Sequence, residues 1–88
     1  MGSRDPLDDG RHRDHLRCID PASNKRRFYA LSVQRTLFDK WVLVREWGRI
    51  GVSGRLRRDP YPSAGPALDA LHELARQKAR RGYEPVGS

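Results

Sequence analysis

A tryptophan, a glycine and an arginine stand side by side at Trp47, Gly48 and Arg49, within the stretch REWGRIGVSG. An exposed indole can stack on a sugar or a base, and a neighbouring guanidinium can pair with a phosphate. A glycine after the tryptophan removes a side chain and lets another backbone segment approach closely. A tryptophan that ends a strand can also cap the core, so the triplet alone leaves a binding role and a structural role open.

Three clusters of basic residues accompany this triplet. Each cluster alone is typical of a solvated surface, and cations near a helix C-terminus are also favoured by the helix dipole. Residues 21–88, which contain all three clusters, carry a net charge of +8, whereas residues 1–20 carry −1. Such a domain attracts polyanions, namely nucleic acid, anionic lipid or an acidic protein. The clusters are Lys25, Arg26 and Arg27; Arg55, Arg57 and Arg58; and Arg76, Lys78, Arg80 and Arg81.

Residues suited to catalysis or metal binding are few. Cys18 has no evident base beside it, and no Ser/His/Asp arrangement, phosphate loop or carboxylate pair is recognisable. His12, His15 and Cys18 are spaced by three, but structural zinc sites take four ligands, and positions 15 and 18 of a strand face opposite sides. We therefore expect no enzymatic activity, small-molecule substrate, metal or cofactor, and interpret Cys18 as a small core residue.

The length and composition bound the class of protein. A chain of 88 residues suits one small domain with a thin core. A single cysteine excludes an internal disulfide, and no apolar run approaches the ~18 residues of a membrane span. The N-terminus lacks an apolar signal region, so the sequence predicts a soluble, cytoplasmic protein that does not bind membranes.

Hydrophobic periodicity indicates the elements that position these residues. Residues 14–20, 27–35 and 40–47 read as strands, and 55–59 as a short fourth strand. Glycines in GRIGVSG predict a turn with positive φ after the third strand. Apolar residues spaced by three and four, from Ala64 to Ala79, form one apolar stripe and predict a helix over 64–81.

Signals at the ends of this helix and the pattern of the third strand complete the fold. Ser63 is the expected N-cap and Gly82 the expected stop. We expect the face of Trp41 and Leu43, rather than that of Val42 and Val44, to contact the helix. The prediction is an α+β fold, in which a small antiparallel sheet of four to five strands carries one C-terminal helix on one face. The domain is expected at 14–84, with flexible tails at 1–13 and 85–88.

Taken in order, these motifs resemble the WGR domain, a family named for its Trp-Gly-Arg triplet. Asn24 and basic residues precede the aromatic pair Phe28-Tyr29, and a strand then leads into the triplet. A further glycine follows at Gly54, and a helix with Lys78 near its end leads to Tyr83. The stretches LVREWGRIG and KARRGY are similar to short bacterial proteins that consist of a lone WGR domain.

The resemblance implies the same sheet-and-helix fold and a DNA-binding role. In poly(ADP-ribose) polymerases the domain binds DNA at strand breaks, and its tryptophan stacks at the terminal nucleotide. Its arginine makes phosphate and interdomain contacts there, which places these roles on Trp47 and Arg49 of this chain. No ADP-ribosyltransferase region accompanies the domain here, so the resemblance implies no polymerase activity.

Our leading hypothesis is a non-enzymatic nucleic-acid-binding module, with DNA as the expected partner and, in a bacterium, an association with the nucleoid. The alternative is a module that docks on a protein partner through the same corner, since an aromatic residue beside an arginine is also typical of protein hot spots. The predicted binding residues are Trp47, Gly48, Arg49, Asn24, Lys25, Arg26, Arg27, Arg55, Arg57, Arg58, Lys78, Arg81 and Tyr83.

Overall fold

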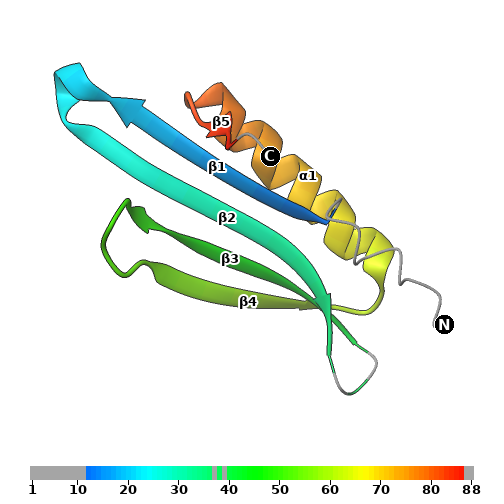
Figure 1. Cartoon of the computed structure of the whole chain (residues 1–88). Helices are drawn as coiled ribbons and strands as arrows, with labels where there is room; N and C mark the ends of the chain where they lie inside the picture. The colour runs from blue at the N-terminus through cyan, green and yellow to red at the C-terminus, as the bar shows by residue number, and fades with distance from the viewer. Residues whose placement is uncertain (1–11, 37, 39, 87–88) are drawn as a thin grey trace, which may run out of the picture.

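A computed structural model describes residues 12–36, 38 and 40–86. Within these ranges lie a five-stranded antiparallel sheet of order β4-β3-β2-β1-β5 and one α-helix (Figure 1), which confirms the predicted α+β class. The elements are β1 (Arg13–Asp20), the short 3-10 helix η2 (Pro21–Ser23), β2 (Lys25–Arg35), β3 (Trp41–Arg49), β4 (Arg55–Tyr61), α1 (Ala64–Arg80) and β5 (Glu84–Pro85).

The sheet includes residues from both regions that we expected to be flexible tails. Residues 1–11 of the expected N-terminal tail lie outside the described residues. Arg13 already belongs to β1, and the carbonyl of His12 accepts a hydrogen bond from the Val33 N–H at 3.0 Å. Pro85, which we placed in the C-terminal tail, pairs with Leu16 in β5. The sheet therefore takes in residues at both ends of the region where we expected it.

The central strands are longer than the sequence patterns predicted. β2 begins at Lys25 and β3 continues to Arg49, because the ladder between them runs on until Arg27 lies opposite Arg49. Our prediction that Gly48 belongs to the following turn is therefore wrong. Of the three glycines from position 48 to position 54, only Gly51 has positive φ, at 88°. β4 also runs past its predicted end to Tyr61, since an edge strand tolerates Pro60.

One face of the sheet is covered by α1 and forms the core. Leu43 of β3 and Leu71 of α1 are completely buried there. Val42 and Val44 lie on the other face and are only partly buried, so the expected helix-facing side of β3 is confirmed. Burial of each such leucine stabilises the fold by roughly 1.5–3 kcal/mol. Cys18 belongs to this core, as expected.

The C-terminal end of α1 departs from the predicted apolar stripe. Ala79, which we assigned to the stripe, is exposed, and Lys78 is partly buried. The helix ends in a Schellman motif, in which the Tyr83 N–H donates to the Lys78 carbonyl and the Gly82 N–H to the Ala79 carbonyl, both at 3.1 Å. Gly82 has φ of 92°, which confirms it as the stop. This reversal of the chain brings Tyr83 back beside Lys78.

Gly48 and Gly54 are required by close approach rather than by backbone conformation. A Cβ atom on Gly48 would lie 2.9 Å from the Cα of Gly54. A Cβ atom on Gly54 would collide with the carbonyl oxygen of Trp47 and lie 2.9 Å from the ring of Phe28. The predicted close approach of two backbone segments after Trp47 is therefore confirmed, and the ring of Phe28 occupies the space that the glycines leave.

Candidate nucleic-acid interface

The β1–β2 hairpin projects beyond the C-terminal end of α1 (Figure 1), so the helix no longer covers the sheet there. A concave groove of about 660 Å³ lies at this place. It collects side chains from η2, the facing ends of β2 and β3, the last turn of α1 and the segment after it. The residues that line the groove are Ser23, Asn24, Lys25, Arg26, Arg27, Tyr29, Trp47, Gly48, Arg49, Lys78 and Tyr83.

Three aromatic rings form the floor of the groove. Tyr29 and Trp47 are direct cross-strand partners, and their rings stack with centroids 5.8 Å apart and an interplanar angle of 20°. Tyr83 meets Tyr29 edge-on, with centroids 6.4 Å apart and an angle of 80°. Tyr29 and Tyr83 are buried, whereas Trp47 is half-buried and packs against the core. Trp47 therefore supports the core and also presents indole surface to the groove.

Lys78 lies over this aromatic floor. Its Nζ is 4.4 Å from the ring centroid of Tyr29 and 5.5 Å from that of Tyr83, which are cation–π distances. Burial lowers the pKa of the Lys78 ammonium below its usual value, and the charges of Arg81, Arg45 and Arg27 lower it further. The lowered pKa means that the protonated ammonium is disfavoured by its surroundings. An anion in the groove would offset that cost.

Two arginines face each other across the rim. Arg27 of β2 and Arg49 of β3 are paired in the register, lie on the helix-side face, and are both exposed. Like charges directly opposite each other destabilise a sheet. Neither arginine forms an ion pair with a described carboxylate, so the fold leaves this repulsion uncompensated. A phosphate group between the two guanidinium groups would remove it.

The tip of the β1–β2 hairpin is held by its own polar contacts. Asn24 adopts the left-handed conformation, with φ of 53° and ψ of 38°, which asparagine tolerates better than most residues. The Asp20 carboxylate accepts hydrogen bonds from the Ser23 hydroxyl at 2.7 Å and from the Ala22 N–H at 3.2 Å. The Ser23 bond is the main reason that the pKa of Asp20 is lowered. This carboxylate therefore caps η2.

Arg45 lies behind the groove on the same face of β3. Its Nη2 lies 2.8 Å from Oδ2 of Asp59, whose other oxygen lies 2.8 Å from Nε of Arg57. Burial opposes the charge of Arg45, but a hydrogen bond to the Tyr29 hydroxyl and the charge of Asp59 outweigh it and raise its pKa. Arg45 thereby links β4 to the aromatic floor.

Nine of the predicted binding residues come together in the groove, and four do not. Arg57 is paired with Asp59, and Arg58 lies on the face opposite α1. Arg55 is exposed beside Trp47 in the ladder, and Arg81 is the exposed C-cap of α1, but neither lines the groove. The nine are Asn24, Lys25, Arg26, Arg27, Trp47, Gly48, Arg49, Lys78 and Tyr83.

Tyr29 is the central residue that the sequence analysis did not place in the site. The signal was present, because the two-residue period puts Tyr29 and Trp47 on the same face of adjacent strands. Only the register shows that they are direct partners. Elsewhere in the described ranges, no group of three His, Cys, Asp or Glu side chains is placed to hold a metal ion. No helix in the described part of the chain is long and apolar enough to cross a membrane.

Comparison with known proteins gives a family match over most of the chain. The family model of the WGR domain matches residues 12–88. An uncharacterized protein of Sinorhizobium fredii, y4dW, is 36% identical over 74 residues, which are 84% of this chain and 36% of that protein. The chain thus spans about a third of the length of this relative. No solved structure matches the chain.

Proposed function

Because the chain belongs to the WGR domain family, whose members are generally nucleic-acid-binding modules, we propose that it binds DNA in the groove and catalyses no reaction. The observation that carries the proposal is the meeting of unpaired cations and an aromatic floor in one concavity. Arg27, Arg49 and Lys78 come from three different elements, and none forms an ion pair with a described carboxylate. The fold gives Lys78 cation–π contacts with Tyr29 and Tyr83, but it places no described carboxylate against any of the three cations.

Each part of the groove has a distinct role in this proposal. The exposed part of the Trp47 indole stacks on a sugar or a base of the bound strand. Arg49 and Arg27 hold a phosphate between them through charge-assisted hydrogen bonds. Lys78 contributes positive potential from the floor, and Lys25 and Arg26 extend this potential toward the hairpin tip. Contacts of this kind favour the phosphate backbone over any particular base sequence.

The proposal is tested with Arg49→Ala and a matched control, Arg80→Ala. Both remove one exposed arginine, but Arg80 does not line the groove. Affinity for a fluorescent duplex is measured by anisotropy over a series of salt concentrations. We expect Arg49→Ala to weaken binding by ~1–3 kcal/mol and to reduce the salt slope by about one unit, with an unchanged melting temperature.

Two results would contradict the proposal. One is a folded Arg49→Ala variant that keeps the affinity and the salt slope of the wild type. The other is a loss of affinity in Arg80→Ala as large as in Arg49→Ala, which would indicate attraction by net charge alone. A protein-docking role predicts instead a partner whose affinity barely responds to salt, since an apolar hot spot releases no counterions.

A further inference from the structure

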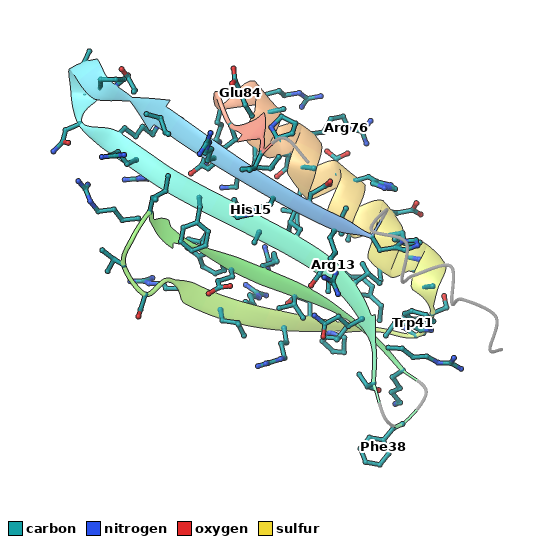
Figure 2. The ribbon with its side chains drawn as sticks, in the orientation of Figure 1. Arg13, His15, Phe38, Trp41, Arg76 and Glu84 are labelled. Carbon is teal, nitrogen blue, oxygen red and sulfur yellow. The ribbon has the colours of Figure 1, made fainter. Side chains whose placement is uncertain are left out.

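The helix covers only one face of the sheet, and the other face, here called the open face, contains a second hollow. This open-face hollow has a volume of about 320 Å³ and is lined by His15, Arg17, Phe28, Ile50 and Val86. Figure 2 shows His15, which belongs to β1. The volume is near the lower end of the ~300–1,000 Å³ of small-ligand pockets, which suits a single planar group.

Phe28 lies at the centre of the hollow, and its ring is held in place by the backbone of β3 and of the segment before β4. Its ring packs against Gly48 and Gly54, where a Cβ atom would lie 3.5 Å and 2.9 Å from ring carbons. His15 meets it edge-on, with ring centroids 6.4 Å apart and an angle of 82°. Phe28 is nonetheless only partly buried. A fixed aromatic ring with accessible surface on a sheet is a platform on which a base can stack.

Two arginines beside Phe28 are placed to contact an anionic ligand. Arg17 is the direct partner of Phe28 in the β1–β2 ladder, and Arg26 lies two positions before Phe28 on the same face. Two carboxylates act against them: Glu84 is paired with Arg17 in the β1–β5 ladder, and Glu46 lies two positions before Gly48. Glu46 weakens phosphate binding towards β4 and leaves the end of the hairpin as the basic part of this face. Neither carboxylate forms an ion pair with Arg17 or Arg26.

The hollow and the groove lie near the same end of the sheet, on its two opposite faces. Arg26 and Gly48 line the groove, while Phe28 and Ile50 line the hollow. The Ile50 N–H donates a hydrogen bond to the Arg26 carbonyl at 2.9 Å, and Phe28 is paired with Gly48. β3 ends at Arg49, whereas the β1–β2 hairpin extends beyond that point, so a chain that leaves the groove reaches the hollow by passing around the end of β3.

We propose that the open-face hollow is a second nucleic-acid site, which takes an unpaired base that leaves the groove. The base stacks on Phe28, and Arg17 and Arg26 contact the phosphates on either side of it. An acidic peptide would satisfy the arginines but would leave the aromatic platform unused, so the combination favours a nucleotide strand. The inference rests on the proposed function, since the strand arrives from the groove.

The test compares a blunt duplex with the same duplex that carries an unpaired tail. Phe28→Leu keeps apolar volume against Gly48 and Gly54 but removes the aromatic face, and Arg17→Ala removes an exposed charge. We expect the wild type to bind the tailed duplex more tightly. Either variant should lose about fivefold or more of this preference, the lower limit for one stacked base, with little change for the blunt duplex. Arg80→Ala should leave this preference intact.

The outcomes separate this inference from the proposed function. A wild type without tail preference, or folded Phe28→Leu and Arg17→Ala variants with the full preference, would overturn the second site and leave the groove unaffected. If Arg49→Ala leaves blunt-duplex binding unchanged, the groove proposal fails instead. An NMR titration of Arg49→Ala with a short single strand tests the hollow directly, and shifts of the Arg17, Phe28 and Ile50 amides are expected. Absence of these shifts would count against the second site, as would an acidic peptide that alone produces them.

Discussion

Replacement of Trp47 by alanine separates the two roles that the structure gives this residue. Complete removal of a fully buried aromatic residue costs ~3–5 kcal/mol. Trp47 is half-buried, so we expect about half of this range, which includes the loss of its stack on Tyr29 at 5.8 Å. A loss of about 2 kcal/mol lowers the melting temperature of a domain of this size by roughly 8–16 °C. DNA affinity should fall by a further ~1–3 kcal/mol in the molecules that remain folded.

Trp41→Ala is the matched control for this prediction. Trp41 lies on the same face of β3 at its other end and is also partly buried against the core (Figure 2). It lies outside the groove, so its replacement should destabilise the fold to a similar extent without weakening DNA binding. Thermal unfolding and anisotropy are measured on both variants at a temperature where each is folded. Equal losses of DNA affinity in the two variants would refute the role of Trp47 as a stacking residue.

Three further predictions concern the residues that support the site. Gly48→Ala should destabilise by ~1–3 kcal/mol in urea unfolding, because its Cβ would lie 2.9 Å from the Gly54 backbone, whereas Gly65→Ala meets nothing within 4 Å and should cost nothing. An unchanged midpoint in Gly48→Ala would contradict the close approach. Leu71→Ala should cost ~2–5 kcal/mol, since Leu71 is fully buried, and a loss below about 1 kcal/mol would argue against the packing of α1 on the sheet. The pKa of Lys78 is lowered in the folded protein, so the folded state binds fewer protons than the unfolded chain. The free-energy cost of holding the Lys78 ammonium in the fold is present below the folded pKa and disappears as pH rises toward the usual 10.5. The free energy of unfolding of the wild type relative to Lys78→Met should therefore increase over that pH window. A stability difference that stays constant with pH would show that folding does not lower the pKa of Lys78.

The class of fold and most of the groove could be predicted from the chain itself. Alternation in residues 27–35 and 40–47 indicated two neighbouring strands, and the apolar spacing indicated the helix. The same alternation gave the correct inward face of β3, which Leu43 now occupies. The resemblance to WGR domains directed attention to Asn24–Arg27, Lys78 and Tyr83, which are far apart in sequence and meet in the groove.

The ends of elements were less predictable than the elements themselves. Gly48 suggested a turn because glycine is permissive at positive φ, yet it lies within β3 with ordinary strand pairing. The reason for a glycine there is contact with Gly54 and Phe28, which depends on how the chain returns after the turn. Lys78 lies seven positions after the fully buried Leu71, so helix geometry places Lys78 rather than Ala79 on the side that faces the sheet.

The sequence by itself determined which residues are available: a basic domain, an alternating hairpin, an amphipathic helix and a Trp-Gly-Arg triplet. These are local properties, since charge, two-residue alternation and helical spacing depend only on residues that are close together in the sequence. Only the tertiary structure decided which of the basic residues converge. Arg57 is ion-paired with Asp59 and Arg58 faces away from α1, whereas Lys78 lies over Tyr29 and lines the groove with Trp47. That selection depends on strand register and on where the helix stops against the sheet, and both are set by packing between segments distant in the chain.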